Sequence, residues 1–316
     1  MKIFSKILVV GLFIVTLLIS VNAADFTIGD PVTYKAITIF PVLNKDTKVA
    51  PKDYLSLEEA TKEDLLVIVE VSEGGTVNTL KATNRSRRPI YIMAGEIIEG
   101  AKQNRTIGID IIIKPLAKNV KIPVFCVEQG RWTYQEKEFK SKNQIVTAKV
   151  RSAANNDGSQ SAVWENVAKQ NEKLGTKNKT GNYTEIYNSK EISKKIKQIK
   201  APFLDLPANN KNMVGVVVYI GTDVVLDVFG NRSLFLKKWD ALLEAYVIDA
   251  IDVEISRKLP SRSEAEKFLQ EALTAKSKHK ESIHNTDQEK VDSKKVKGTR
   301  VKDEEGNDLH LNFYNK

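Results

Sequence analysis

The sequence contains very little cysteine or histidine. Cys126 is the one cysteine in 316 residues, so no disulfide can form within the chain. The three histidines, His279, His284 and His310, are too scattered to match a zinc-binding pattern. The fold must therefore be held by a hydrophobic core, and a chain of this length is long enough to build one.

Glycine-rich phosphate-binding motifs are also absent. Gly215, Gly221 and Gly230 do not form a phosphate-binding loop, and neither Gly-x-Gly-x-x-Gly nor Walker spacing occurs anywhere in the chain. We therefore expect no nucleotide site of a standard glycine-loop kind. The sequence assigns no cofactor and no metal site.

Long apolar runs are missing except at the amino terminus. Lys2 and Lys6 precede a 14-residue apolar run over 7–20, and small residues follow at 21–23. This order is typical of a secretory signal cleaved before Ala24. The run is shorter than the roughly 20 residues that span a bilayer. We expect an exported protein, periplasmic or extracellular, with no transmembrane segment after cleavage.

A single sign of charge does not dominate any long stretch. The chain carries a net charge of +9, and loss of Lys2 and Lys6 with the signal would leave +7. The residues from 261 onward hold 12 Lys or Arg and 11 Asp or Glu, so the basic residues are interleaved with acids. This pattern favours a solvated surface over a nucleic-acid interface.

The first half of the chain is rich in short β-branched runs separated by turn residues. One short helix is predicted after Ser56, because Ser56 and Glu59 form a capping box. The predicted strands are 34–42, 65–71, 77–83, 90–93, 107–114 and 122–127. The fold class is therefore α+β, with a β-rich first half that forms a sheet or sandwich and a mixed second half.

The second half opens with residues 151–160, whose Asn, Ser, Ala and Gly content predicts a connecting loop. A β-hairpin is predicted over 213–220 and 224–229, followed by an amphipathic helix over 235–250. Ser263 is predicted to start a further helix through a capping box. We divide the chain into a signal at 1–23, a compact unit at 24–275, a polar disordered segment at 276–295, and a strand pair at 296–316 that returns to the unit.

The main candidate site is a polar cluster among predicted strands, in segments 95–105 and 128–132. Ionic and amide groups in such a setting cost several kcal/mol unless they are paired, solvated or used. Gly95 and Gly100 indicate tight turns, so the residues between them are predicted as a short strand or loop. The candidate residues are Glu96, Glu99, Lys102, Gln103, Asn104, Arg105, Glu128, Arg131 and Trp132.

Several kinds of chemistry fit this cluster. Glu96 and Glu128 could act as a general acid and base if they converge, since crowding raises the pKa of one carboxyl group. Together with Glu99 they could instead hold a divalent cation. Arg105 and Arg131 have the planar fork that suits phosphate or carboxylate, and Trp132 offers a stacking surface.

Other interpretations of the same residues remain open. The polar groups could satisfy one another in a structural network, for example Arg105 with Glu96 or Glu128. Cys126 lies in an apolar strand with no histidine nearby in sequence, which favours core packing over a nucleophile. His310 alternates with two leucines on a predicted strand, and an exposed position is expected for it.

Several segments resemble a known domain family. They include Gly-Glu-x-x-x-Gly-Ala-Lys-Gln-Asn-Arg at 95–105, Ile-Pro-Val-Phe-Cys-Val-Glu-Gln-Gly-Arg-Trp at 122–132, and Leu-Leu-Glu-Ala-Tyr-Val-Ile-Asp-Ala at 242–250. Together they are similar to the domain named for its association with ADP-ribosylglycohydrolase and rhodanese-phosphatase superfamily proteins. The name records genomic association rather than an activity, so the resemblance implies ADP-ribose or nucleotide-linked chemistry by association only.

The leading hypothesis is an exported ligand-binding or interaction module, whose partner is a small anionic ligand or another envelope component. A hydrolase acting on a phosphorylated or ADP-ribose-like compound is the alternative, with Glu96 or Glu128 as acid and base and Arg105 and Arg131 as anion clamps. A structural envelope protein is a third possibility.

Overall fold

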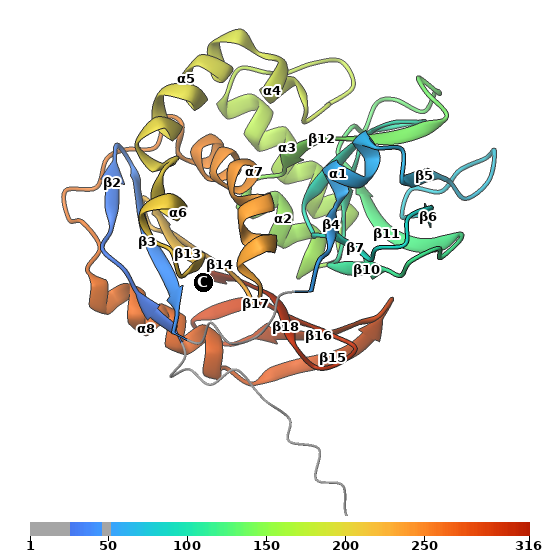
Figure 1. Cartoon of the computed structure of the whole chain (residues 1–316). Helices are drawn as coiled ribbons and strands as arrows, with labels where there is room; N and C mark the ends of the chain where they lie inside the picture. Colours follow the sequence, from blue (N-terminus) through green and yellow to red (C-terminus); the bar gives the residue numbers. More distant parts are fainter. Residues whose placement is uncertain (1–25, 46–51) are drawn as a thin grey trace, which may run out of the picture.

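The computed structural model describes residues 26–45 and 52–316, which form a closed β-barrel, a large β-sheet and a layer of helices (Figure 1). The predicted signal at 1–23 lies outside the described residues. The helices are α1 (Leu57–Lys62), α2 (Ala148–Asn155), α3 (Gln160–Lys173), α4 (Glu185–Asn188), α5 (Lys190–Lys200), α6 (Leu206–Asn209), α7 (Arg232–Ala250) and α8 (Arg262–Thr274), with a 3-10 turn at Ala201–Phe203.

The barrel is built from the first half of the chain, in the strand order β11-β6-β5-β12-β8-β9. Its strands are β5 (Leu66–Glu70), β6 (Thr79–Asn84), β8 (Glu96–Gly100), β9 (Arg105–Ile107), β11 (Val120–Cys126) and β12 (Glu138–Ile145). A small sheet of β4 (Leu55–Ser56), β7 (Ile90–Ile92) and β10 (Ile111–Ile113) lies beside it. The predicted β-rich first half is confirmed.

The large sheet joins the start of the chain to its end. Its order is β1-β3-β13-β14-β18-β17-β16-β15, with β2 paired to β3, and all its pairs are antiparallel. The strands are β1 (Phe26–Ile28), β2 (Val32–Tyr34), β3 (Ile37–Asn44), β13 (Met213–Ile220), β14 (Asp223–Phe229), β15 (Ser277–Ile283), β16 (Thr286–Asp292), β17 (Val296–Asp303) and β18 (Asp308–Asn315).

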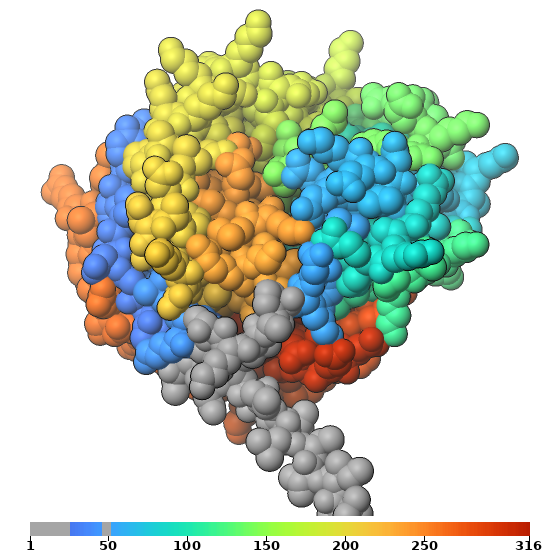
Figure 2. Space-filling model, in the orientation of Figure 1, coloured from blue at the N-terminus to red at the C-terminus, as the bar shows by residue number. Residues whose placement is uncertain are grey.

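Both faces of this sheet are covered by helices. Successive side chains of a strand point to opposite faces, so Val216 packs with α7 and the neighbouring helices, whereas Val217 packs with Phe268 of α8. A second cluster, which includes Ile68 and Val124, fills the barrel. Part of α7 reaches the surface between the yellow helices and the blue and cyan start of the barrel (Figure 2). None of the helices in the described segments combines the length and apolar character needed to cross a bilayer.

Several predicted elements are confirmed. Ser56 and Glu59 form the expected capping box of α1, and the β13–β14 hairpin, α7 and the closing β17–β18 pair all form as predicted. The capping box of α8 is shifted, because its N-cap is Ser261 rather than Ser263, with Glu264 as its partner.

Two segments differ from their prediction. Residues 151–160 were expected to be a loop, but α2 runs through Asn155 because Val150, Ala153 and Ala154 bury one helical face in the core. The segment 276–295 was expected to be disordered, and this prediction is wrong. Its polar residues form the β15–β16 hairpin, in which β16 pairs with β17 along its whole length. Backbone pairing to an existing sheet edge stabilises strands that have few apolar side chains.

The predicted strand 107–114 is also broken in two. Residues 105–107 belong to β9 in the barrel, and residues 111–113 form β10 in the small sheet. The chain leaves the barrel between them, and Asp110 in this connection is buried and accepts a hydrogen bond from the Ala94 amide at 2.8 Å.

Candidate functional site at the loop end of the barrel

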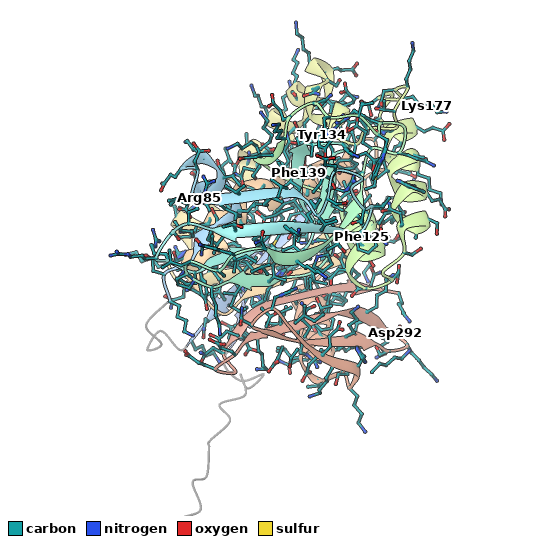
Figure 3. All side chains as sticks on the ribbon, turned by 90° about the vertical axis from the view of Figure 1, so that its right-hand side faces the viewer. Arg85, Phe125, Tyr134, Phe139, Lys177 and Asp292 are labelled. Atoms are coloured by element: carbon teal, nitrogen blue, oxygen red, sulfur yellow. The ribbon has the colours of Figure 1, made fainter. Side chains whose placement is uncertain are left out.

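The two predicted site segments meet at one end of the barrel. There β5, β8 and β11 end, and β6, β9 and β12 begin. The connecting loops 71–78, 101–104 and 127–137 converge at this point, which we call the loop end. Figure 3 faces the barrel and shows Tyr134 close to Phe139 at the loop end, on the side away from Asp292 in the C-terminal strands.

Glu128 and Arg131 hold the loops together. Glu128 Oε2 accepts hydrogen bonds from the Asn104 amide at 3.1 Å and from Arg131 Nε at 2.8 Å, and Oε1 accepts one from Thr180 at 3.1 Å. Arg131 also donates to the carbonyl of Ala101 at 2.8 Å and to the side chain of Asn104 at 3.0 Å. These polar groups hydrogen-bond to one another, so this part of the cluster holds the loops together.

Gln103 and Asn104 add hydrogen bonds to the same network. The side-chain amide of Gln103 donates to the backbone carbonyl of Glu128 at 3.0 Å. The side-chain amide of Asn104 donates to the side chain of Asn182 at 3.3 Å. Thr180 and Asn182 come from a polar segment that the sequence did not connect to the site. Asn and Thr in a loop carry no pattern that would show which distant loop they contact.

Arg105 lies beneath these loops, inside the barrel. Its side chain is on the same face of β9 as Ile107, which belongs to the barrel core, and it is fully buried. Nη1 donates to Gln103 Oε1 at 2.7 Å, whereas Nε and Nη2 have no hydrogen-bond partner within residues 26–45 and 52–316. Burial lowers the pKa of the Arg105 guanidinium, because a charged group loses hydration there.

Glu70 faces Arg105 from β5 but does not complete its hydrogen bonding. Arg105 Nη2 and Glu70 Oε1 are 3.9 Å apart, beyond hydrogen-bond distance. Both carboxylate oxygens of Glu70 are buried and have no hydrogen-bond partner in the part of the chain that the structure describes. Buried polar atoms are nearly always bonded, so four unpartnered atoms on two facing side chains mark this pair as unusual.

An aromatic lid covers the pair. Trp132 is 43% exposed and lies over Arg105, whose guanidinium carbon is 5.6 Å from the ring centroid. Tyr134, 49% exposed, lies nearby, and the Lys102 ammonium is 5.3 Å from the Trp132 centroid and 5.1 Å from that of Tyr134. Lys102 also donates to the carbonyls of Glu73 and Gly74, which holds the 71–78 loop against the lid.

Cys126 belongs to the interior of the same barrel end. It is fully buried, and its sulfur accepts a hydrogen bond from the Glu128 amide at 3.4 Å. Burial raises the pKa of the thiol, which disfavours the thiolate. The sequence-based prediction of core packing for Cys126 is confirmed.

Glu96 and Glu99 lie apart from the hydrogen-bond network of Glu128 and Arg131. Glu96 Oε1 accepts from Lys238 of α7 at 2.5 Å, and Oε2 accepts from the Met93 amide at 2.6 Å. Glu99 is half-buried and lines an open hollow of about 690 Å³ with Lys140 and Lys142. Burial raises the pKa of Glu99. Glu96 and Glu128 therefore take part in separate networks, and each of their carboxylate oxygens already has a donor.

A second polar centre, which sequence reasoning missed, joins the barrel to the large sheet. His310 was expected to be exposed, but it is buried, with Nδ1 2.8 Å from Asp110 and Nε2 2.9 Å from Asp227. Arg151 makes a bidentate pair with Asp227 at 2.9 and 2.7 Å. Asp227 interrupts the apolar run 224–229 of β14, and this is a local signal for a buried polar group.

The charges of this centre stabilise one another. Burial alone would lower the pKa of His310, but Asp110 and Asp227 outweigh it and raise the pKa to about 9. Burial would likewise raise the pKa of Asp227, but Arg151 and His310 lower it to about 2. Within residues 26–45 and 52–316, no three His, Cys, Asp or Glu side chains are grouped so as to hold a metal ion.

The fold and the site define an α+β protein in which a six-stranded barrel with a polar, aromatic-capped end is fixed to a nine-stranded antiparallel sheet. The chain belongs to the ARPP-1 family, the ARG and Rhodanese-Phosphatase-superfamily-associated Protein domain, whose model matches residues 25–314. The comparisons with curated proteins and with solved structures found no match.

Proposed function

We propose that the protein is a binding module that recognises a small ligand with an anionic group at the loop end of the barrel. The observation that carries this proposal is the free edge of Arg105. Nε and Nη2 lie on the same side of the guanidinium, and neither has a hydrogen-bond partner. This edge fits the two oxygens of a carboxylate or phosphate.

Lys102 near Arg105 favours an anionic ligand, whereas the Glu70 carboxylate, 3.9 Å from Arg105 Nη2, opposes one, so the ligand must displace Glu70 from that edge. Lys102 lies beside the lid, and its ammonium adds a positive charge near Arg105 and Trp132. An exposed indole and an exposed phenol at the same loop end offer apolar area to the non-ionic part of a ligand. Binding requires Trp132 to move off the guanidinium that it covers, and its partial exposure leaves room for that.

The positions of the carboxylates favour binding over hydrolysis. A general acid and base must reach the same reacting bond. Glu96 is held by Lys238, and Glu128 is held by Arg131, Asn104 and Thr180. Neither is placed with the other around one cleft, so the loop end supports recognition more directly than catalysis.

The test is a thermal-shift titration of the mature chain with inorganic phosphate, ribose 5-phosphate and ADP-ribose. A ligand present at 100 times its Kd adds about 2.7 kcal/mol to the free energy of unfolding. We expect the phosphorylated compounds to raise Tm, and we expect Trp132→Ala to reduce the rise with ribose 5-phosphate and ADP-ribose, whose non-ionic parts lose the indole, more than the rise with inorganic phosphate. Tyr34→Ala, which removes another exposed aromatic side chain on β2, is the control and should leave the rise intact.

A second variant tests the guanidinium itself. Arg105→Lys keeps the positive charge but removes the two-nitrogen edge, so it should weaken binding of phosphate-bearing ligands by roughly tenfold. Binding that survives both Trp132→Ala and Arg105→Lys, or no Tm shift with any of the three compounds, would count against the proposal.

We also propose that the protein is exported through residues 1–23. The support is the order of two lysines, an apolar run and small residues at the amino terminus. Intact mass measurement of the protein recovered outside the inner membrane of an expressing bacterium tests this. A chain beginning at Ala24 is expected, and a cytosolic chain that retains Met1 would contradict it.

A further inference from the structure

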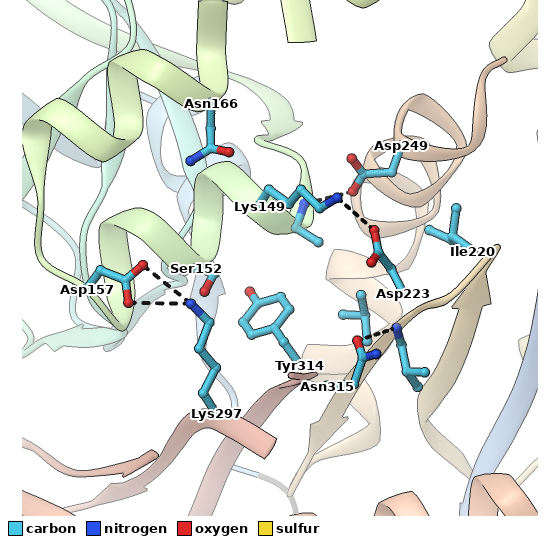
Figure 4. Close-up of a pocket in the computed structure, with 13 residues that line it drawn as sticks. Lys149, Ser152, Asp157, Asn166, Ile220, Asp223, Asp249, Lys297, Tyr314 and Asn315 are labelled. Carbon is cyan, nitrogen blue, oxygen red and sulfur yellow. Dashed lines mark hydrogen bonds and ion pairs between the residues drawn. The ribbon is translucent and has the colours of Figure 1, made fainter. Parts of the chain in front are cut away.

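A second cavity, which shares no lining residue with the loops 71–78, 101–104 and 127–137, lies between the large sheet and the helices. It has a volume of about 250 Å³ and is lined by the first turns of α2, the end of α7, the β13–β14 turn and the strands β17 and β18. Figure 4 shows the Tyr314 ring in the middle of this region, with Ser152 and Lys149 on α2 beside it and Asp249 on α7 beyond.

The lysines of the cavity are already matched by acids. Lys149 pairs with Asp223 at 3.0 Å, and Lys297 pairs with Asp157 at 3.4 Å (Figure 4). These four side chains sit at the rim, where three of them are largely exposed. The rim therefore presents no unbalanced charge that would select an ion of one sign.

The inner wall carries polar groups with spare hydrogen-bonding capacity. Tyr314 is only 6% exposed, and its buried hydroxyl makes no hydrogen bond of good geometry within the described residues, although Arg151 and Asn312 lie beside it. A ligand in the cavity reaches this hydroxyl only if the wall shifts slightly. Asp249 Oδ2 accepts the Ala148 amide at 2.9 Å, which leaves Oδ1 for a further donor. Ser152 accepts from Asn156 at 3.3 Å, so its own hydroxyl proton is free to be donated.

The remaining wall is apolar. Ile220, Val224 and Val225 lie along one side of the cavity. A volume of about 250 Å³ is below the roughly 300–1,000 Å³ of pockets that hold drug-sized molecules. The occupant must therefore be small, with hydroxyl-like groups on one side and C–H surface on the other.

We propose that this cavity binds a neutral polyhydroxylated molecule of monosaccharide size. Hydroxyl groups both donate and accept, so they match Tyr314, Ser152 and Asp249 together. The paired lysines at the rim add no preference for an anion. Burial raises the pKa of Asp249 to about 6, so at pH 7.5 Asp249 is a carboxylate that accepts hydrogen bonds from the hydroxyl groups of a neutral sugar.

The test uses three sugars that differ in charge at one carbon: glucose, glucosamine and glucuronate, each titrated calorimetrically into the mature chain at pH 7.5, with ribose as a smaller neutral probe. We expect heat of binding with glucose or ribose. Binding of glucuronate should be at least threefold weaker than that of glucose, because its carboxylate meets that of Asp249, and glucosamine should bind no more tightly than glucose. Tighter binding of either charged sugar would overturn the neutral-ligand assignment. So would the absence of binding by all four.

Variants place the binding in the cavity. Tyr314→Phe removes a hydroxyl that makes no hydrogen bond of good geometry within the described residues, so the variant should fold with little change in Tm and bind the sugar roughly tenfold more weakly. Ser152→Ala should act in the same direction. Tyr219→Phe, on the half-buried Tyr219 of β13, is the control and should bind normally. Unchanged affinity in both Tyr314→Phe and Ser152→Ala would overturn the proposal. Trp132→Ala distinguishes this cavity from the loop end, because it should leave sugar binding intact.

Discussion

Arg105 and Arg151 are both buried arginines, yet their surroundings give them different roles. Arg151 makes a bidentate pair with Asp227, which raises its pKa well above the ordinary value despite burial. Arg105 makes one side-chain hydrogen bond and stands 3.9 Å from Glu70. A buried charge is stable when it is paired and hydrogen-bonded. Among the described residues Arg151 leaves only Nε without a hydrogen-bond partner, because both terminal nitrogens bind Asp227, whereas Arg105 leaves both Nε and Nη2. Arg151 is therefore a structural residue, whereas Arg105 has an edge left for a ligand.

His310 gives the first prediction, a stability that depends on pH. Its pKa rises from 6.5 to about 9 on folding, so proton binding favours the folded state. This contribution is complete below about pH 6.5 and is lost as the pH rises through 9. The Asp227 contribution has the opposite sign, because its pKa falls to about 2: it is complete above about pH 4 and is lost as the pH falls through 2.

Urea unfolding at pH 6 and pH 10 measures this effect. His310→Ala should lower the free energy of unfolding by about 3 kcal/mol at pH 6, because it leaves two buried carboxylates without their partner. The difference from wild type should shrink at pH 10. His279→Ala, at an exposed position on β15, is the matched control. A loss that is equal at both pH values would show that the imidazole is neutral in the fold.

Glu96 and Lys238 give a second prediction, which separates a structural role from a catalytic one. Lys238→Met leaves Glu96 buried without its cation and should lower the free energy of unfolding by about 3 kcal/mol. Glu96→Gln in the same chain removes the unpaired charge and should recover a large part of that loss. Chemical denaturation of both single variants and the double variant gives the coupling energy, which should exceed about 1 kcal/mol. Additive losses would mean that the two side chains do not form the pair.

At the scale of elements, Gly100 decides how β8 and β12 approach each other. Its φ of +127° is rare for residues with a side chain, and a Cβ there would lie 2.4 Å from the carbonyl oxygen of Glu138. Gly158 also has a positive φ, but nothing lies within 4 Å of a Cβ built on it. Substitutions at these two glycines therefore distinguish the cost of a strained backbone from the cost of steric overlap.

The third prediction follows from this comparison. Gly158→Ala should cost about 1 kcal/mol of unfolding free energy, from the left-handed backbone alone. Gly100→Ala should cost several times more, because the Glu138 backbone must move and the barrel pairing of β8 with β12 must open. Thermal unfolding of both variants under one set of conditions provides the measurement. Similar losses in the two variants would contradict the close approach at Gly100.

Helices and strands with a strong local sequence pattern could be predicted from the sequence. Strands that are stabilised mainly by pairing with distant strands could not. The run 235–250 has helical spacing of apolar residues, and 213–229 has a glycine turn between β-branched runs, so α7 and the hairpin were identified. The strands β12, β15 and β16 are polar, and their stability comes from neighbouring strands that are distant in sequence. Local composition carries no information about such neighbours.

The candidate site shows the same division. The segments 95–105 and 128–132 do meet, and their glycines, charges and aromatic residue pointed to the loop end. The partners of these residues were hidden, since Glu70, Thr180 and Asn182 have no distinctive local pattern. Glu96 was grouped with Glu128 on the condition that the two segments converge in space, but the partner of Glu96 is Lys238 of α7.

At the scale of the whole molecule, buried polar contacts bind the barrel half to the sheet half. Asp110, between β9 and β10, accepts from Gln288 of β16 at 2.9 Å and contacts His310 of β18 at 2.8 Å. Glu96 of the barrel pairs with Lys238 of α7. Separating the halves would leave several charges without partners, at a cost of several kcal/mol for each broken pair.

The last prediction is that the two halves unfold together. Trp132 reports on the loop end of the barrel and Trp239 on α7, so variants that keep one of these tryptophans, with the other two replaced by Phe, follow each half separately. Fluorescence and circular dichroism should give coincident urea midpoints within each variant. If the barrel unfolded first, the Trp132 signal would change at lower urea than the circular dichroism of the same variant. Adding His310→Ala to both single-tryptophan variants removes one of the buried charge contacts between the halves. Any separation of the two unfolding transitions should therefore appear or widen in the variants that carry His310→Ala.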